Sequence, residues 1–168
     1  GVGLRIESLA TVGIVAISSS LTPFIGQNLG ANKLERIRIA INYSFVLSGV
    51  WGILIALPLL IFSNDFSNLF SYNAAVQIYL IDYLKIISLS YIFWGWSNIA
   101  SSAFNGYQRP FIAMFIFLSR LFVITVPLVL LGNYYYGLTG ILFGIMISNV
   151  ISGILSIIYT KTSLSLKI

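Results

Sequence analysis

The feature that most constrains this chain is a series of long stretches almost free of charged residues. A helix needs about 20 mainly apolar residues to cross a membrane. Stretches of that length predict five spans near 9–29, 41–63, 80–106, 111–131 and 138–160. Only 8% of the 168 residues are charged, against about 25% in a soluble domain. The sequence therefore predicts an all-α, polytopic transmembrane helical bundle in contact with membrane lipid. It excludes a soluble enzyme, and no nucleic-acid partner is expected.

Basic residues indicate which end of this bundle faces the cytoplasm. Most of them fall on one side of the predicted spans: Lys33, Arg36, Arg38, Arg109, Lys161 and Lys167. The other side carries Arg5 and Lys85 among three acids, Glu7, Asp65 and Asp82. Because basic loops stay inside, we expect a multi-pass protein of the cell membrane with a cytoplasmic carboxyl terminus. The first span then begins outside, so we expect the chain to be a fragment preceded by another helix.

The third span has a polar face. Residues of this face recur three or four positions apart, as on one side of a helix: Ser88, Tyr91, Gly95, Asn98, Ser102 and Asn105. Lipid offers no hydrogen bonds, so the face must meet protein or a water-filled cavity. One interpretation is a substrate cavity, for which we name Tyr91, Trp94, Asn98 and Ser102. The other is hydrogen bonding between packed helices, and both stay open.

The fifth span carries a small residue at every fourth position. These residues are Gly140, Gly144, Ser148, Ser152 and Ser156. Small side chains let neighbouring backbones approach closely in membrane bundles. The ridge therefore predicts a packing surface.

Arg120 is a charge within the fourth span. It lies nine or ten residues into that span, about 15 Å deep at the rise of an α-helix. A guanidinium at that depth is costly, and it should face the bundle and bind carbonyls or a carboxylate. A functional site is the first interpretation, and a structural clamp on helix ends is the second.

The sequence offers no catalytic constellation. It contains no His and no Cys, which removes the commonest general base and the thiolate ligands. Gly26 and Gly30 do not form a phosphate loop, because no Lys-Ser/Thr pair follows Gly30. We expect no enzyme activity, no cofactor and no metal site.

The end of the first span carries a recognisable motif. Thr22 to Arg36 reads TPFIGQNLGANKLER, with Gly26, Gln27, Asn28 and Gly30 as its core. This segment resembles the multidrug and toxic compound extrusion (MATE) family, in which it closes the second helix of a six-helix lobe. Further matching segments are Gly3–Leu9, Phe104–Pro110, Ser119–Arg120, Val126–Leu128 and Gly137–Gly140.

The resemblance implies helices eight to twelve of a twelve-helix transporter, the C-terminal lobe. It implies a secondary antiporter that exports organic cations or other xenobiotics in exchange for H⁺ or Na⁺, together with an N-terminal lobe absent from this chain. Some members carry acids in the helix corresponding to the third span, but here that helix has Trp94 and Asn98 at its centre. We therefore assign no coupling residue from the sequence.

Two other functions stay open at this point. A lipid-linked oligosaccharide flippase of the same superfamily would share the fold, but it should line its cavity with several Lys and Arg. A non-transporting membrane subunit would use the small-residue ridge only to pack against a partner.

Overall fold

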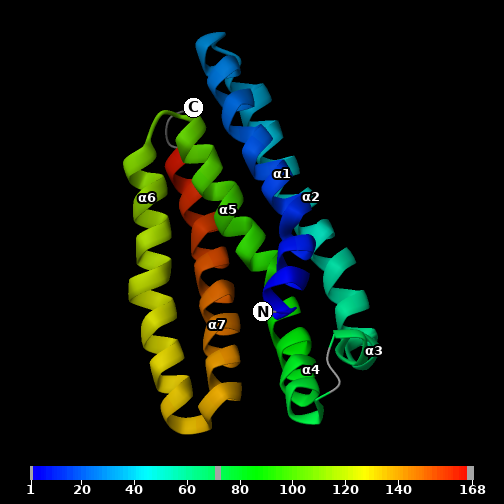
Figure 1. The fold of residues 1–168 in the computed structure, drawn as a ribbon. Coiled ribbons are helices and arrows are strands. Elements are labelled where there is room, and N and C mark those ends of the chain that lie inside the picture. Colours follow the sequence, from blue (N-terminus) through cyan, green and yellow to red (C-terminus); the bar gives the residue numbers. More distant parts are fainter. Residues whose placement is uncertain (1, 71–72, 166–168) are drawn as a thin grey trace.

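Every element in the described part of the chain is helical, which confirms the predicted all-α class. The computed structural model describes residues 2–70 and 73–165. Its elements are α1 (Val2–Gly30), α2 (Leu34–Ile61), α3 (Ser63–Phe70), α4 (Ala74–Ser88), α5 (Tyr91–Gly106), α6 (Pro110–Leu118), the π-helix η1 (Ser119–Thr125) and α7 (Val126–Ser165). Figure 1 shows the long helices side by side, with α3 and α4 at the end opposite the carboxyl terminus.

Helix α5 lies at the centre of the bundle. It packs against α1 and α2 on one side and against α7 on the other (Figure 1). The core around it includes Ile25, Phe45, Ile99 and Phe104, all nearly or fully buried. Gly106 at its end lets α1 approach closely, since a Cβ there would lie 2.6 Å from the Cβ of Ile25.

The predicted third span is not one continuous helix in the structure. It is divided at Leu89–Ser90 into α4 and α5, whose axes differ by 51°. The Ser90 hydroxyl donates a hydrogen bond to the carbonyl of Ile87 at 2.8 Å. A serine hydroxyl that bonds a nearby backbone carbonyl competes with the regular hydrogen bonds of the helix. The side-chain amide of Asn149 on α7 donates a hydrogen bond to the same hydroxyl at 3.0 Å.

The last two predicted spans form a helical hairpin. The run α6–η1–α7 reverses at Gly137, so its two limbs lie side by side (Figure 1). The turn is narrower than the gap at 132–137 between the last two predicted spans, because Gly137 alone leaves helical geometry, with φ 60° and ψ −138°. Only glycine adopts this conformation without strain. Gly132 stays helical and lies directly against the backbone of Gly140.

The outer surface of the bundle is apolar. Large hydrophobic side chains are exposed on α2 and α6, including Val46, Leu54, Phe111 and Phe115. Such a surface is unfavourable in water and is solvated by lipid tails. Within residues 2–70 and 73–165, three helical runs are long and apolar enough to cross a membrane, or four when the bent pair α4–α5 is counted as one span. The five individual spans stay a prediction.

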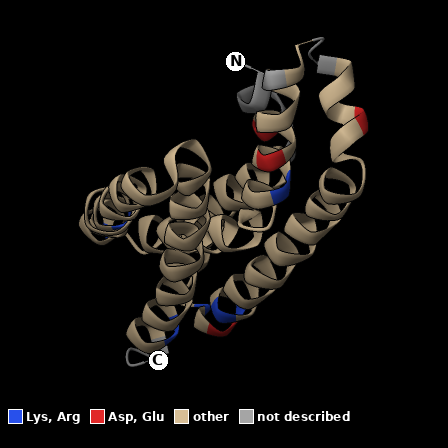
Figure 2. Cartoon of the chain, turned by 90° about the horizontal axis from the view of Figure 1, so that it is seen from below, with Lys and Arg blue, Asp and Glu red and all other residues tan. Residues whose placement is uncertain are grey.

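Charged residues lie mainly near the ends of the helices. Figure 2 shows most of the chain between these ends without charge. The end at which α1 meets α2 and α5 meets α6 carries Lys33, Arg36, Arg38 and Arg109, and Lys161 lies near it on α7. We call this the basic end. Lys167 and the side chain of Arg5 lie outside the described residues, and the cytoplasmic orientation stays a prediction.

Candidate functional site

The four residues predicted to line a cavity do not share one environment. Tyr91 is only 3% exposed and packs in an apolar cluster with Leu59 and Leu84. Trp94, Asn98 and Ser102 are half-buried. The Asn98 side-chain amide donates to the carbonyl of Trp94 at 2.8 Å, within its own helix. None of the four lines either of the two pockets described below, so their role stays a prediction.

Among the four, Ser102 takes part in a contact between helices, since its carbonyl accepts a hydrogen bond from the Thr22 hydroxyl on α1 at 3.1 Å. On α5, the side chains that bond other helices are Ser97 and Trp96, which the sequence analysis did not select. Ser97 on α5 meets Ser152 and Ser156 on α7, with hydroxyl oxygens 3.5 Å and 3.4 Å apart. The Trp96 indole donates to the carbonyl of Phe45 on α2 at 3.2 Å. The interpretation of polar groups as contacts between helices therefore describes this flank of α5.

The small-residue ridge of α7 is buried along its whole length. Gly140 and Gly144 lie against the first limb of the hairpin, at Gly132 and Leu128. The Ser148 hydroxyl lies 3.0 Å from that of Thr125. Ser152 and Ser156 contact Ser97 on α5, as described above. The ridge is a packing surface, as predicted, and it serves two neighbours.

Arg120 lines a pocket of about 400 Å³ between the two limbs of the hairpin. Its other walls are mostly apolar, with hydroxyls on one side: Phe115, Ile116, Ser119, Ile124, Ser152, Leu155, Ser156, Ile158, Tyr159 and Thr162. The guanidinium forms no hydrogen bond or ion pair with any residue that the structure describes. The carboxylate of Glu7 on α1 attracts the guanidinium electrostatically without forming an ion pair with it. The expected direct contacts with carbonyls or a carboxylate are therefore not formed in the described structure, and the clamp interpretation lacks them.

The local backbone explains where Arg120 points. It belongs to η1, a short π-helical segment in which the Thr125 hydroxyl reaches back to the Arg120 carbonyl at 2.9 Å. Pro127 follows two residues later and has no N–H for the regular ladder. Wide turns of this kind often occur at functional sites. The Arg120 guanidinium therefore lies between the two limbs of the hairpin, at a pocket that a ligand can enter.

Sequence reasoning missed the carboxylate of Glu7. We expected it near a membrane surface, and that depth stays a prediction, but α1 begins at Val2, so Glu7 lies within the helix. Its side chain is half-buried and accepts a 2.7 Å hydrogen bond from the Tyr83 hydroxyl on α4. One feature of the sequence could have indicated this. The apolar residues that precede the first predicted span continue its helical pattern, so the helix could be expected to begin before Glu7. The pair can hold a proton or a small cation.

The motif residues Gly26, Gln27, Asn28 and Gly30 form the last turns of α1 rather than a loop. The Asn28 amide donates to the carbonyl of Phe24 at 2.8 Å, and its own carbonyl accepts from the backbone of Lys33 at 2.9 Å. The motif therefore ends α1 and directs the chain into α2. It brings no side chains together around a ligand.

Comparisons with known proteins agree on one family. The MatE family model matches residues 1–131. A protein of Shewanella oneidensis named FAD transporter is 36% identical over 154 residues, which cover 92% of this chain and 34% of that protein. The Vibrio cholerae MATE transporter VcmN in its bent form is 28% identical, with a TM-score of 0.92 over 97% of this chain and 37% of that one.

A MOP superfamily transporter from Pyrococcus furiosus shares the fold alone, at 20% identity and a TM-score of 0.90, over 98% of this chain and 37% of its own. The chain spans about a third of the length of each of these relatives. Its helices, its terminal motif on α1 and the match over most of its length lead to one conclusion: the chain belongs to the MATE family of membrane transporters.

Proposed function

We propose that this chain forms one lobe of a secondary transporter that exchanges a flat, negatively charged organic solute for H⁺ or Na⁺. It works with a second lobe, because the chain spans only about a third of its relatives. Flavin nucleotides are the proposed substrate class. The observation that carries this proposal is the unpaired guanidinium of Arg120 in its pocket.

The composition of the Arg120 pocket supports an anion over a cation. The wall contains one positive charge and no carboxylate. Inside a membrane protein a charge without a close partner is costly, and Glu7 attracts the Arg120 guanidinium only from a distance. An anionic group that binds in the pocket therefore lowers that cost. Tyr159 and Phe115 offer ring faces and apolar surface to a flat aromatic group. A volume of about 400 Å³ is in the range of small-molecule sites.

The similarity to a protein named FAD transporter supports the same substrate class. FAD joins a flat ring system to a pyrophosphate, which matches an apolar aromatic pocket that holds one guanidinium. A guanidinium binds phosphate oxygens through paired hydrogen bonds.

Export of organic cations is the second candidate. The half-buried Trp94 favours it, because an indole face attracts cations. The hydrogen-bonded carboxylate of Glu7 favours it too, and the same carboxylate is our proposal for the coupling ion. A lipid-linked oligosaccharide flippase receives less support, because we expect it to line its cavity with several Lys and Arg, and Arg120 is the one basic residue deep in a predicted span.

Transport by the full-length protein in proteoliposomes tests the proposal. We expect gradient-driven movement of FAD and little movement of ethidium. Arg120→Gln should reduce FAD transport by about tenfold or more, because it removes one pair of charge-assisted hydrogen bonds to the phosphate. Arg120→Lys, which keeps the charge, should retain part of the activity.

Arg109→Gln is the matched control, because it removes the same charge at a residue outside both pockets. Ethidium transport without FAD transport would favour the cation exporter. Equal loss of FAD transport in the Arg120 and Arg109 variants would contradict the assignment of the pocket.

A further inference from the structure

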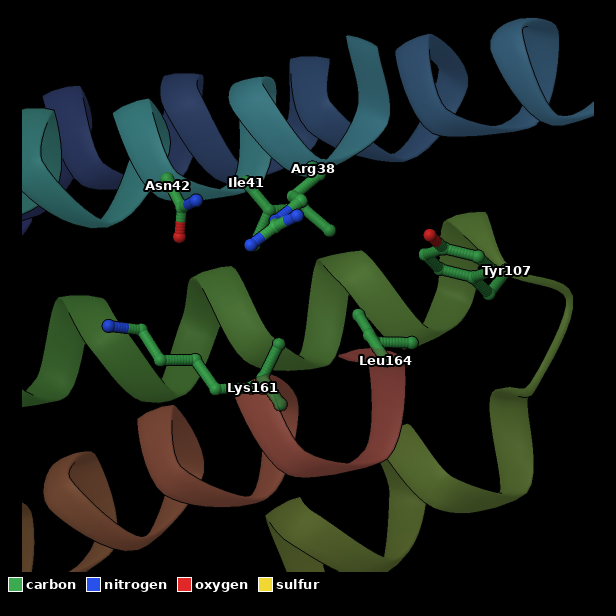
Figure 3. A pocket seen from close by; sticks show the side chains of 7 residues that line it. Arg38, Ile41, Asn42, Tyr107, Lys161 and Leu164 are labelled. Carbon is green, nitrogen blue, oxygen red and sulfur yellow. The ribbon is translucent and has the colours of Figure 1, made fainter. Parts of the chain in front are cut away.

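A second pocket opens at the basic end, on the opposite flank of α7 from Arg120. It has a volume of about 550 Å³ and lies between α2 and the ends of α5 and α7. Its lining residues are Arg38, Ile41, Asn42, Tyr107, Thr160, Lys161 and Leu164. Figure 3 shows Arg38 and Asn42 extending from α2 toward the side on which Lys161 and Leu164 lie. None of the functions considered above uses this pocket.

The pocket is rich in hydrogen-bond donors that have no partner. Arg38 and Lys161 contribute two positive charges from two helices far apart in the chain. The Asn42 amide and the Tyr107 hydroxyl are the other polar groups at its walls. In the described part of the chain, these four side chains form no hydrogen bond or ion pair with one another or with any other residue.

No acid neutralises the two cations. The lining contains no Asp or Glu. Glu35 is the carboxylate nearest in sequence, one helical turn before Arg38, and it forms no ion pair with Arg38 in the described structure. The pocket therefore keeps a net positive charge, which attracts anions.

The arrangement of these donors favours phosphate over a carboxylate. Donors reach the space from separate walls, α2 on one side and α7 on the other (Figure 3). A planar carboxylate presents two oxygens in one plane. A tetrahedral phosphate presents oxygens in several directions and can accept from both walls, and arginine and lysine are its usual ligands.

The position along the helices also suits a phosphate at a membrane surface. Arg38 is the fifth residue of α2, about 6 Å from its start at the α-helical rise. Ile41 and Leu164 are buried in the apolar part of the wall. Basic pockets between spans, near helix ends, are where acidic head groups bind.

We propose that the pocket at the basic end is a phosphate-binding site in which Arg38 and Lys161 hold one phosphate group between them. The phosphate belongs either to the head group of an anionic phospholipid or to a soluble nucleotide. The site is separate from the Arg120 pocket, and the proposal does not depend on the transport activity.

Two binding experiments on the full-length protein, purified in a neutral detergent, identify the source. In the first, native mass spectrometry counts bound phosphatidylglycerol, with phosphatidylcholine as the zwitterionic comparison. In the second, calorimetry measures the binding of ADP and of inorganic pyrophosphate. Binding in the first arm alone assigns a lipid head group, and binding in the second alone assigns a soluble phosphate. When both occur, competition between them places both in one site.

The double variant Arg38→Gln/Lys161→Gln should weaken binding by about tenfold or more in the arm that shows it. The matched control is Lys33→Gln/Arg36→Gln, which removes two charges from the same end at residues outside the pocket. It should bind like the parent protein. The charge-conserving variant Arg38→Lys/Lys161→Arg should retain binding, which shows that the walls stay folded.

Three results would overturn the proposal. Binding in neither arm would do so. Equal weakening of binding in the pocket variant and in the control variant would mean that the phosphate is attracted to the basic end as a whole rather than to this pocket. Unchanged binding in the pocket variant would place the phosphate elsewhere.

Discussion

Gly153 lies at a close approach of α7 to α5, and its substitution tests the packing of the bundle. A Cβ at this position would lie 2.5 Å from the carbonyl oxygen of Phe93 and 2.8 Å from the Phe93 Cα. Both atoms belong to the backbone, so they cannot rotate away as a side-chain tip can. Gly153→Ala therefore forces the two helices apart.

The expected loss of stability follows from two costs and one opposing gain. Overpacking of a well-packed interface costs about 1–3 kcal/mol. The separation also removes the hydroxyl contacts of Ser97 with Ser152 and Ser156, which are already at the limit of hydrogen-bond length, for about 1 kcal/mol. Alanine recovers up to about 1 kcal/mol through its higher helix propensity. We expect a net destabilisation of about 1–3 kcal/mol.

Equilibrium unfolding of the full-length protein in mixed detergent micelles gives this difference. Gly26→Ala on α1 is the matched control, because a Cβ there meets no atom within 4 Å. That variant should be neutral or more stable by up to about 1 kcal/mol. If Gly153→Ala unfolds at the same point as Gly26→Ala, the close contact of α5 with α7 is not as described.

Three further substitutions follow from the structure. Ser88 carries a buried hydroxyl with no hydrogen-bond partner in the described structure. Ser88→Ala should therefore raise the free energy of unfolding by about 1 kcal/mol, measured by the same equilibrium unfolding. A decrease would mean that the hydroxyl has a partner. Gly137→Ala places a Cβ on a glycine-only conformation and should cost about 1–3 kcal/mol, unless the hairpin turn moves. Glu7→Gln should leave FAD binding intact but uncouple transport from the imposed gradient; retained gradient dependence would exclude Glu7 as the ion carrier.

Parts of the fold could be predicted because they depend on local sequence alone. The ridge from Gly140 to Ser156 lies on one helical face whatever its partner, since its spacing matches the helical period. The turn at Gly137 has a local cause too, a residue that tolerates positive φ. The bend at Ser90 could not be predicted, because it depends on a hydrogen bond from Asn149, a residue on another helix.

The candidate sites were less predictable than the fold. Arg120 stood out because a charge inside an apolar stretch is rare. Its lack of partners depends on where η1 lies against the second limb of α7. The predicted cavity face on α5 stays a prediction. Tyr91 packs in an apolar cluster, and helical spacing places residues on one side of a helix without saying what packs there.

The sequence alone determined the class of this protein, because long uncharged stretches leave a chain no stable structure except helices in lipid, with charges near their ends. The tertiary structure decided which side chains meet. Arg38 and Lys161 line one pocket from helices far apart in the chain, and no periodicity within either helix relates their positions. Helical period is a property of one segment, whereas a site depends on distances between segments.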